Sequence, residues 1–108
     1  MKFIIFVLDG HNSSGTDEEM AAVNKFNEKL RSNGHWVVAA GITAPEFATL
    51  IDNRLRAGII SSGSVFKDKD HYSGFWIIET LDQEIAQTLA LEGSESCNRR
   101  VGLRPFLN

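Results

Sequence analysis

The stretch KFIIFVL, Lys2–Leu8, decides the fold because it is apolar on both sides. It is rich in β-branched and aromatic residues and ends at Asp9-Gly10, a pattern typical of a β-strand that runs into a turn. Successive side chains of a strand point to opposite faces, so each face of this strand would carry three large apolar groups. These two sets are Phe3, Ile5 and Val7, and Ile4, Phe6 and Leu8.

Two further segments repeat this two-sided pattern. The segment HWVVAAGI, His35–Ile42, and the segment SGFWIIE, Ser73–Glu79, both predict strands with apolar residues on both faces. An antiparallel sheet that is covered on one side alternates apolar with polar residues, and these strands do not. We therefore expect one sheet that is buried on both faces.

The intervening segments predict two helices. Thr16 followed by Glu19 has the form of a capping box, and an apolar stripe at helical spacing runs to Leu30 before the stop signal Asn33-Gly34. The second helix would begin after Thr80 or Asp82 and end at Gly93. Its buried stripe would consist of Ile85, Ala86, Leu89 and Ala90.

A hairpin and a last strand complete the expected order. Ala48–Asp52 and Gly58–Val65 predict the two arms of a hairpin with its turn at residues 53–57, and Arg99–Phe106 predicts a final strand stopped by Pro105. The order β-α-β, hairpin, β-α-β predicts an α+β fold over the single domain 1–108, a ferredoxin-like split βαβ with an inserted β-hairpin.

This fold leaves one face of the sheet without cover, since two helices following the two halves normally lie on the same side. About half a dozen large side chains would then meet water, at ~1.5–3 kcal/mol each, which sums to the order of 10 kcal/mol. A second copy packed sheet to sheet is the simplest cover, so we expect a homodimer. The alternative is that the hairpin folds back over this face.

Composition excludes several classes of protein. The 108 residues are 43% hydrophobic and 23% charged, with a net charge of −3 and 11 scattered basic residues, so we expect no binding to nucleic acid. The apolar run near the start is too short for a signal peptide or a membrane span, which predicts a cytoplasmic protein without membrane contact. Cys97 is the single cysteine, so no intrachain disulfide can form.

Two segments resemble the YCII-related family. FNEKLRSNGHWVVAAGI, Phe26–Ile42, is similar to the family's passage from a helix ending in Gly into a Gly-containing strand, and SGSVFKDKDHYSGFW, Ser62–Trp76, is similar to its DGPF region. The closing Arg104-Pro105-Phe106 also matches, so the resemblance covers nearly the whole chain. It implies a dimeric α/β-barrel that binds a small organic molecule.

The chain departs from the family where chemistry would be expected. Of the DGPF tetrapeptide only Gly63 is kept, and Lys67 replaces an acid, while Lys69 and Asp70 match the loop that follows. One branch of the family carries a His–Asp pair. Two alignments place these positions at Val23 or Asn24 and at Gly34 or His35, and neither restores the pair.

Three functional hypotheses follow. The first is a small-molecule cleft to which His35 and a set of binding residues contribute, namely Asn24, Ser62, Lys69, Asp70 and Trp76. The second is a lyase, isomerase or dehydrohalogenase with His35 as its base. The third is a non-catalytic interaction or regulatory module. No metal or cofactor is expected, because no close-spaced ligand pair, Walker motif, dinucleotide fingerprint or nucleophile elbow occurs.

Other polar segments are better explained as ordinary loops. Asp9 and His11 form a common turn composition, and the charged run from Lys67 through Asp68 to His71 is typical of a solvated loop. Ser61–Ser64 resembles an anion-binding backbone nest without a helix start.

Overall fold

Four strands form an antiparallel sheet in the order β2-β5-β1-β6, and two more form a separate hairpin. The computed structural model describes residues 1–10, 15–64 and 69–107. The elements are β1 (Lys2–Asp9), α1 (Asp17–Ser32), β2 (Trp36–Gly41), η1 (Pro45–Phe47), β3 (Thr49–Asp52), η2 (Arg54–Arg56), β4 (Ile59–Ser62), β5 (His71–Glu79), α2 (Gln83–Cys97) and β6 (Val101–Pro105). The predicted α+β fold is confirmed, and the strand order is compatible with a ferredoxin-like split βαβ. His11, Val65, Lys67 and Asp68 lie outside the described residues.

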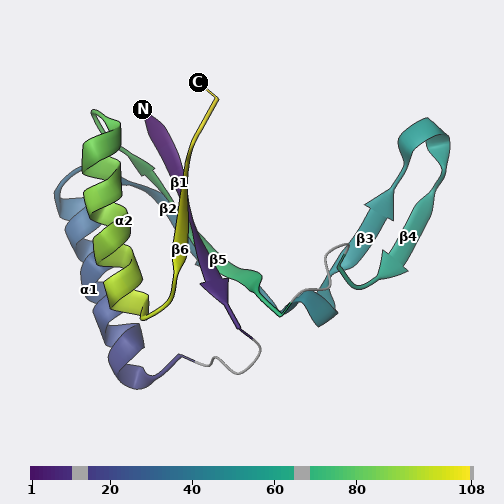
Figure 1. Ribbon diagram of the computed structural model, residues 1–108, viewed down its shortest axis with the longest axis horizontal. Coiled ribbons are helices and arrows are strands. Elements are labelled where there is room, and N and C mark those ends of the chain that lie inside the picture. Colours follow the sequence, from purple (N-terminus) through teal and green to yellow (C-terminus); the bar gives the residue numbers. More distant parts are fainter. Residues whose placement is uncertain (11–14, 65–68, 108) are drawn as a thin grey trace.

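Both helices lie on one side of the sheet, where they bury its inner face (Figure 1). Phe3 and Ile5 of β1, Ile78 of β5 and Leu30 of α1 are fully buried in this layer. The Phe26 ring meets the Trp76 indole edge to face, with ring centroids 5.3 Å apart. The core is therefore a two-layer packing of helices on sheet.

The sequence located the starts of both helices. Thr16 and Glu19 make both bonds of a capping box at the start of α1, at 3.0 and 3.1 Å, and Gly34 follows the helix with φ of 76°. Of the two predicted caps for α2, Asp82 is the one that accepts from the Ile85 amide, at 2.9 Å. The Thr80 hydroxyl donates to the Asp82 carbonyl instead.

The prediction that Gly93 ends α2 is wrong, because the helix continues to Cys97 and ends at Asn98 in the left-handed conformation, with φ of 54°. Gly93 is buried within the helix against the Phe26 ring, and a Cβ there would lie 3.2 Å from that ring. The missing side chain lets the helix pack closely against that ring, a tertiary reason that helix propensity cannot show.

The last strand is shorter than predicted. β6 spans Val101–Pro105, and Pro105 pairs with Phe3 at the edge of the sheet. Arg99 and Arg100 precede the strand, and their side chains donate hydrogen bonds to Asp9 and Asp70.

The outer face of the sheet, away from the helices, is apolar as the sequence indicated. Paired residues of neighbouring strands share a face, and the pairs Ile4↔Ile77, Phe6↔Phe75 and Leu8↔Tyr72 therefore lie together. Val38 of β2 joins them, and Phe6 stacks on Tyr72 with centroids 4.4 Å apart. We call the set Ile4, Phe6, Leu8, Val38, Tyr72, Phe75 and Ile77 the outer face. No helix within the described ranges covers it.

The β3–β4 hairpin does not fold back over the outer face. It projects from the sheet on the side opposite the helices and stands away from the strands (Figure 1). The radius of gyration of 15.7 Å exceeds the ~13 Å expected for a compact domain of this size, because of this extension. The alternative that the hairpin seals the sheet is therefore wrong.

We predict that Gly93→Ala destabilises the fold by about 1 kcal/mol. The gain in helix propensity, roughly 1 kcal/mol, is outweighed because the buried Phe26 ring is held against Trp76 and cannot give way, and overpacking costs about 1–3 kcal/mol. Urea unfolding measures the change. Gly102→Ala, where a Cβ meets no atom within 4 Å, is the control and should change the free energy of unfolding by less than about 0.5 kcal/mol. A stabilised Gly93→Ala protein would contradict this account.

Candidate functional site

A cavity of about 360 Å³ opens between the sheet and α1. Its apolar lining includes Val23 of α1, Ala39 of β2 and Trp76 of β5, and its polar lining includes Asp9, Asn27 and Arg99. This volume lies within the range of small-molecule sites, roughly 300–1,000 Å³. We call it the sheet–helix cavity.

The cavity exists because side-chain size falls along β2. The strand begins with Trp36, which packs against the core, and continues into Ala39, Ala40 and Gly41, which line the cavity. On the neighbouring strand, a Cβ at Gly74 would lie 2.9 Å from the Ala40 carbonyl oxygen, so no side chain can fill this position. Small residues on two adjacent strands thus leave space below α1.

Asn27 is fixed in the cavity wall by Trp76. The indole Nε1 donates to Asn27 Oδ1 at 2.7 Å. An indole nitrogen can only donate, so the amide oxygen must face it and the amide nitrogen must point elsewhere. Asn27 Nδ2 makes no hydrogen bond in the described part of the chain, and it is available as an oriented donor.

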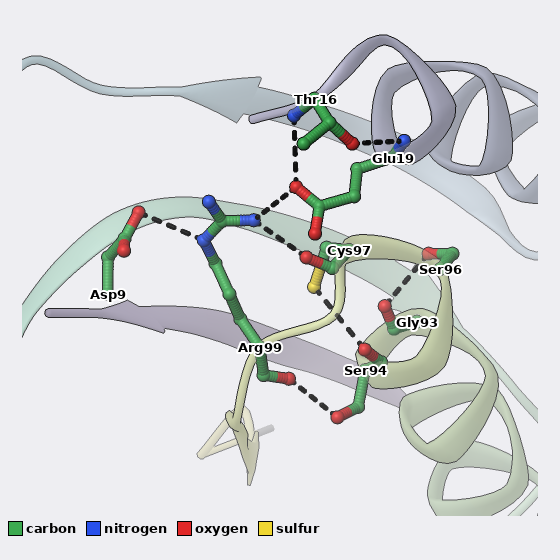
Figure 2. Close-up of polar contacts among 8 residues, drawn as sticks. All are labelled: Asp9, Thr16, Glu19, Gly93, Ser94, Ser96, Cys97 and Arg99. Atoms are coloured by element: carbon green, nitrogen blue, oxygen red, sulfur yellow. Dashed lines mark hydrogen bonds and ion pairs between the residues drawn. The ribbon is translucent and has the colours of Figure 1, made fainter. Parts of the chain in front are cut away.

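Arg99 is held by three elements at the same cavity (Figure 2). Its Nε donates to Asp9 Oδ2 at 3.1 Å, and its Nη1 donates to the Cys97 carbonyl at 2.7 Å and to Glu19 Oε1 at 3.4 Å. The side chains of Arg99, Asp9 and Glu19 are only 14%, 11% and 20% exposed. Nη2 has no partner among the residues described, and it is the free edge of the guanidinium.

The charges of this cluster do not cancel. Asp9 and Glu19 together carry two negative charges against the single positive charge of Arg99. Asp9 Oδ1 is also buried without a hydrogen-bond partner in the described ranges. An unpaired buried acceptor costs about 1–3 kcal/mol, so the cluster is a place where stability is lost. Such sites often serve binding rather than folding.

Glu19 connects the cluster to the start of α1. Hydrogen bonds from the Thr16 backbone, then from the Asn98 side chain, together with the nearby Arg99 charge, hold the pKa of Glu19 below its usual value. Glu19 is therefore ionised at neutral pH and ties the helix cap to Arg99.

Cys97 lies beside Arg99 but is not a nucleophile. Burial raises the pKa of the Cys97 thiol above its usual value, and the hydrogen bond and charge of Arg99 only partly oppose this effect. The thiol stays protonated at neutral pH, and thiolate is the reactive form. Its role is packing in the core.

A second concavity, of about 560 Å³, lies at the base of the hairpin. Its lining includes Leu8 and Tyr72 of the outer face, Pro45, and Asp70. Asp70 pairs with Arg100 at 2.8 Å, but the two side chains are 54% and 72% exposed. Exposed pairs are weak and poorly fixed, so the smaller sheet–helix cavity is the better candidate site.

His35 lies away from the sheet–helix cavity. Its Nδ1 is 2.9 Å from the Glu79 carbonyl oxygen, at the far end of β5. Asp9 of the cavity lies at the opposite end, where it pairs with His71, whereas Asn27 bonds to Trp76 in the middle of the strand. At about 3.4 Å per residue, this places His35 roughly 25 Å from Asp9. Its assignment as a catalytic base stays a prediction.

The other predicted residues are dispersed. Asn24 is exposed on α1, Ser62 is exposed on the hairpin, and Lys69 is exposed before β5. Asp70 lines the second concavity, so of the six predicted residues only Trp76 lines the sheet–helix cavity. Gly63, in the proposed anion nest, donates its amide to the Ala48 carbonyl at 2.8 Å, which removes this donor.

Sequence reasoning missed Asn27 and Arg99. A signal for Asn27 was present, since a polar residue stands four positions after Val23 and three before Leu30, within the buried stripe of α1. No comparable signal marks Arg99, because its partners Asp9 and Glu19 come from distant parts of the chain.

Comparison with known proteins adds no assignment. No protein-family model matches the chain, and no curated protein matches it. Separately, the described helices contain none that is long and apolar enough to cross a membrane.

We predict that Glu19 contributes stability that acid removes. Because its folded pKa is lowered, the contribution is present above the usual value of 4.5 and is lost as pH falls through the folded pKa. The difference in free energy of unfolding between wild type and Glu19→Gln should therefore shrink from pH 7 towards pH 3. Urea unfolding at each pH measures it. Glu18→Gln, an exposed neighbour in the same helical turn, is the control, and an identical pH profile for the two variants would refute the prediction.

Proposed function

We propose that this chain is a YCII-related domain of the ferredoxin-like, dimeric α/β-barrel type, which binds a small organic molecule in the sheet–helix cavity of a homodimer. The strand order β2-β5-β1-β6, with both helices on one face, supports this assignment. The resemblance of Phe26–Ile42 supports it further, because this segment contributes both Asn27 and the small residues of β2 to the cavity.

The observation that carries the proposal is the pair of fixed donors at a mostly apolar cavity. Trp76 orients Asn27 and three acceptors hold Arg99, and within the described ranges this leaves Asn27 Nδ2 and Arg99 Nη2 without a partner. Donors that are held before binding lose little entropy when a ligand arrives. The cavity thus suits a ligand with a hydrogen-bond acceptor on an apolar ring.

The charge of the cluster selects among such ligands. With Asp9 and Glu19 outnumbering Arg99, a carboxylate ligand would meet net repulsion. A neutral carbonyl accepts from both donors without that cost. The ligand class we propose is therefore a small cyclic ester or ketone, ahead of an aromatic acid or a phenol.

The outer face supports the dimer. Seven apolar side chains on the three neighbouring strands β1, β2 and β5 share this surface, and the hairpin does not cover it. Two sheets pack face to face about 10 Å apart, and a two-fold axis would place the same surface of each copy against the other. A sheet-to-sheet homodimer removes both outer faces from water.

We predict that Asn27→Asp weakens binding of a neutral cyclic carbonyl at least ~10-fold. The aspartate keeps an acceptor for Trp76 Nε1 but replaces the Nδ2 donor with a charged oxygen, which repels the ligand carbonyl. The measurement is calorimetric titration with δ-valerolactone and cyclohexanone, with benzoate and phenol as weaker comparators.

Asn24→Asp is the matched control for this experiment. It makes the same change in charge one turn earlier on α1, on an exposed side chain, and should leave affinity within about twofold of wild type. Equal losses in both variants, or no binding of any carbonyl by wild type at millimolar concentration, would remove the proposal.

We also predict that the double variant Ile4→Thr/Ile77→Thr weakens dimerisation at least ~10-fold. These residues are directly paired on the outer face, and Thr keeps the β-branched shape that strands favour while reducing the apolar surface. Sedimentation equilibrium gives the dissociation constant. Leu91→Gln on α2, an exposed apolar site away from the sheet face, is the control. A wild-type chain that stays monomeric at tens of micromolar would disprove the dimer.

A further inference from the structure

The hairpin forms an arm that has no core of its own. The Gly63 amide donates to the Ala48 carbonyl at 2.8 Å, which closes the base, and we call residues 48–63 the hairpin arm. None of its residues is buried. An isolated two-stranded hairpin is marginally stable in water at best, so an arm of this kind needs a surface to rest on.

The arm carries apolar groups for such a surface. Ile51 and Ile60 are directly paired, share one face of the hairpin, and are 67% and 74% exposed. Leu55 at the tip is fully exposed and has φ of 51°, a left-handed conformation that a leucine adopts only at a cost of about 1–2 kcal/mol. The backbone of the turn thus holds a large apolar side chain away from its own chain.

The direction of the arm relates it to the outer face. In Figure 1 the arm stands on the side of the sheet opposite the helices, the same side as the outer face. Leu8 and Tyr72 of the outer face line one concavity together with Pro45 and Ala48 at the base of the arm. This concavity therefore connects the outer face with the base of the arm.

We infer that the hairpin arm packs against a second copy of this chain that is docked on the outer face, so that each copy is embraced by the arm of the other. This inference rests on the dimer proposed above. A two-fold axis makes the contact reciprocal, since whatever surface the first arm meets on the second copy, the second arm meets on the first.

The size of the interface favours this arrangement. A standard interface uses about 20–30 residues from each partner, whereas the outer face offers seven apolar side chains, of which Val38 and Tyr72 are exposed and the others partly buried. Contacts from outside the sheet would bring the interface closer to the standard size. The arm supplies further apolar contacts, from Ile51, Leu55 and Ile60, and reaches beyond the edge of its own sheet.

Charge indicates that the arm contacts the main domain of the second copy, that is, its residues outside 48–63. The arm carries Asp52, Arg54 and Arg56, a formal charge of +1, and the whole chain carries −3, which leaves −4 on the remaining residues. Asp52 and Arg54 pair with each other at 2.8 Å, so Arg56 at the tip is the unbalanced charge. Contact between the arm and the main domain of the second copy is therefore electrostatically attractive, whereas contact between two arms is repulsive.

The test compares two double variants by sedimentation equilibrium. Ile51→Thr/Ile60→Thr on the arm should raise the dissociation constant of the dimer at least ~10-fold, with Leu91→Gln unchanged within about twofold. If Ile4→Thr/Ile77→Thr weakens the dimer while the arm variant does not, the arm inference is overturned and the proposed dimer stands. If wild type is monomeric, both are overturned.

Hydrogen exchange of the wild-type chain gives a readout that needs no substitution. Ladder amides of β3 and β4 should be protected well above the dissociation constant and should exchange at least ~10-fold faster well below it, because the released arm opens locally. Amides at the centre of β1, such as Ile5, should keep their protection at both concentrations. Arm amides whose exchange is independent of concentration would overturn the inference.

Discussion

The structure depends on a four-stranded sheet that is apolar on both faces while helices cover only one. On the inner face, Phe3, Ile5 and Ile78 are fully buried under α1 and α2. On the outer face, Phe6 and Tyr72 stack on one another and keep part of their surface exposed. The hydrophobic effect scales with the apolar area removed from water, so covering the outer face would stabilise the protein further. A second copy and its arm are proposed as the remaining cover.

The sheet–helix cavity arises from the same packing. Large residues such as Trp36 and Leu30 fill the region near one end of β2, whereas Ala39 and Gly41 leave space towards the other end. Asn27 and Arg99 border this space. Asn27 is fixed through its acceptor Oδ1 and Arg99 through its donors Nε and Nη1, so that within the described residues Asn27 Nδ2 and Arg99 Nη2 have no partner. Rigid donors at an apolar opening are a physical basis for selective binding.

The Arg99 cluster joins the cavity to the stability of the fold. Arg99 connects the end of β1, the cap of α1 and the end of α2 through Asp9, Glu19 and the Cys97 carbonyl (Figure 2). Asp9 Oδ1 is buried without a partner among the described residues, which indicates that this part of the cluster is not arranged for maximal stability. A ligand that bonds to Arg99 would therefore act on three elements at once.

The sequence by itself determined the local structure. Strand periodicity in Lys2–Leu8 and Ser73–Glu79, the capping box of Thr16 and the hairpin turn depend on neighbours in the chain. Each was found, although β1 extends one residue further, to Asp9, and β5 begins two residues earlier, at His71. The two apolar faces of the sheet were likewise visible in the sequence, because successive residues of these strands point to opposite faces and both sets are apolar.

Only the tertiary structure decided the rest, because those features depend on residues that are far apart in the chain. Gly93 was predicted to end α2, but the Phe26 ring, 67 positions earlier, makes it a packing residue within the helix. Arg99 contacts Asp9 across 90 positions, and His35 is not among the residues that line the cavity, although it was predicted from the sequence to contribute to it. Which polar groups converge on one cavity is set by strand register and helix placement, and a linear pattern carries no measure of either.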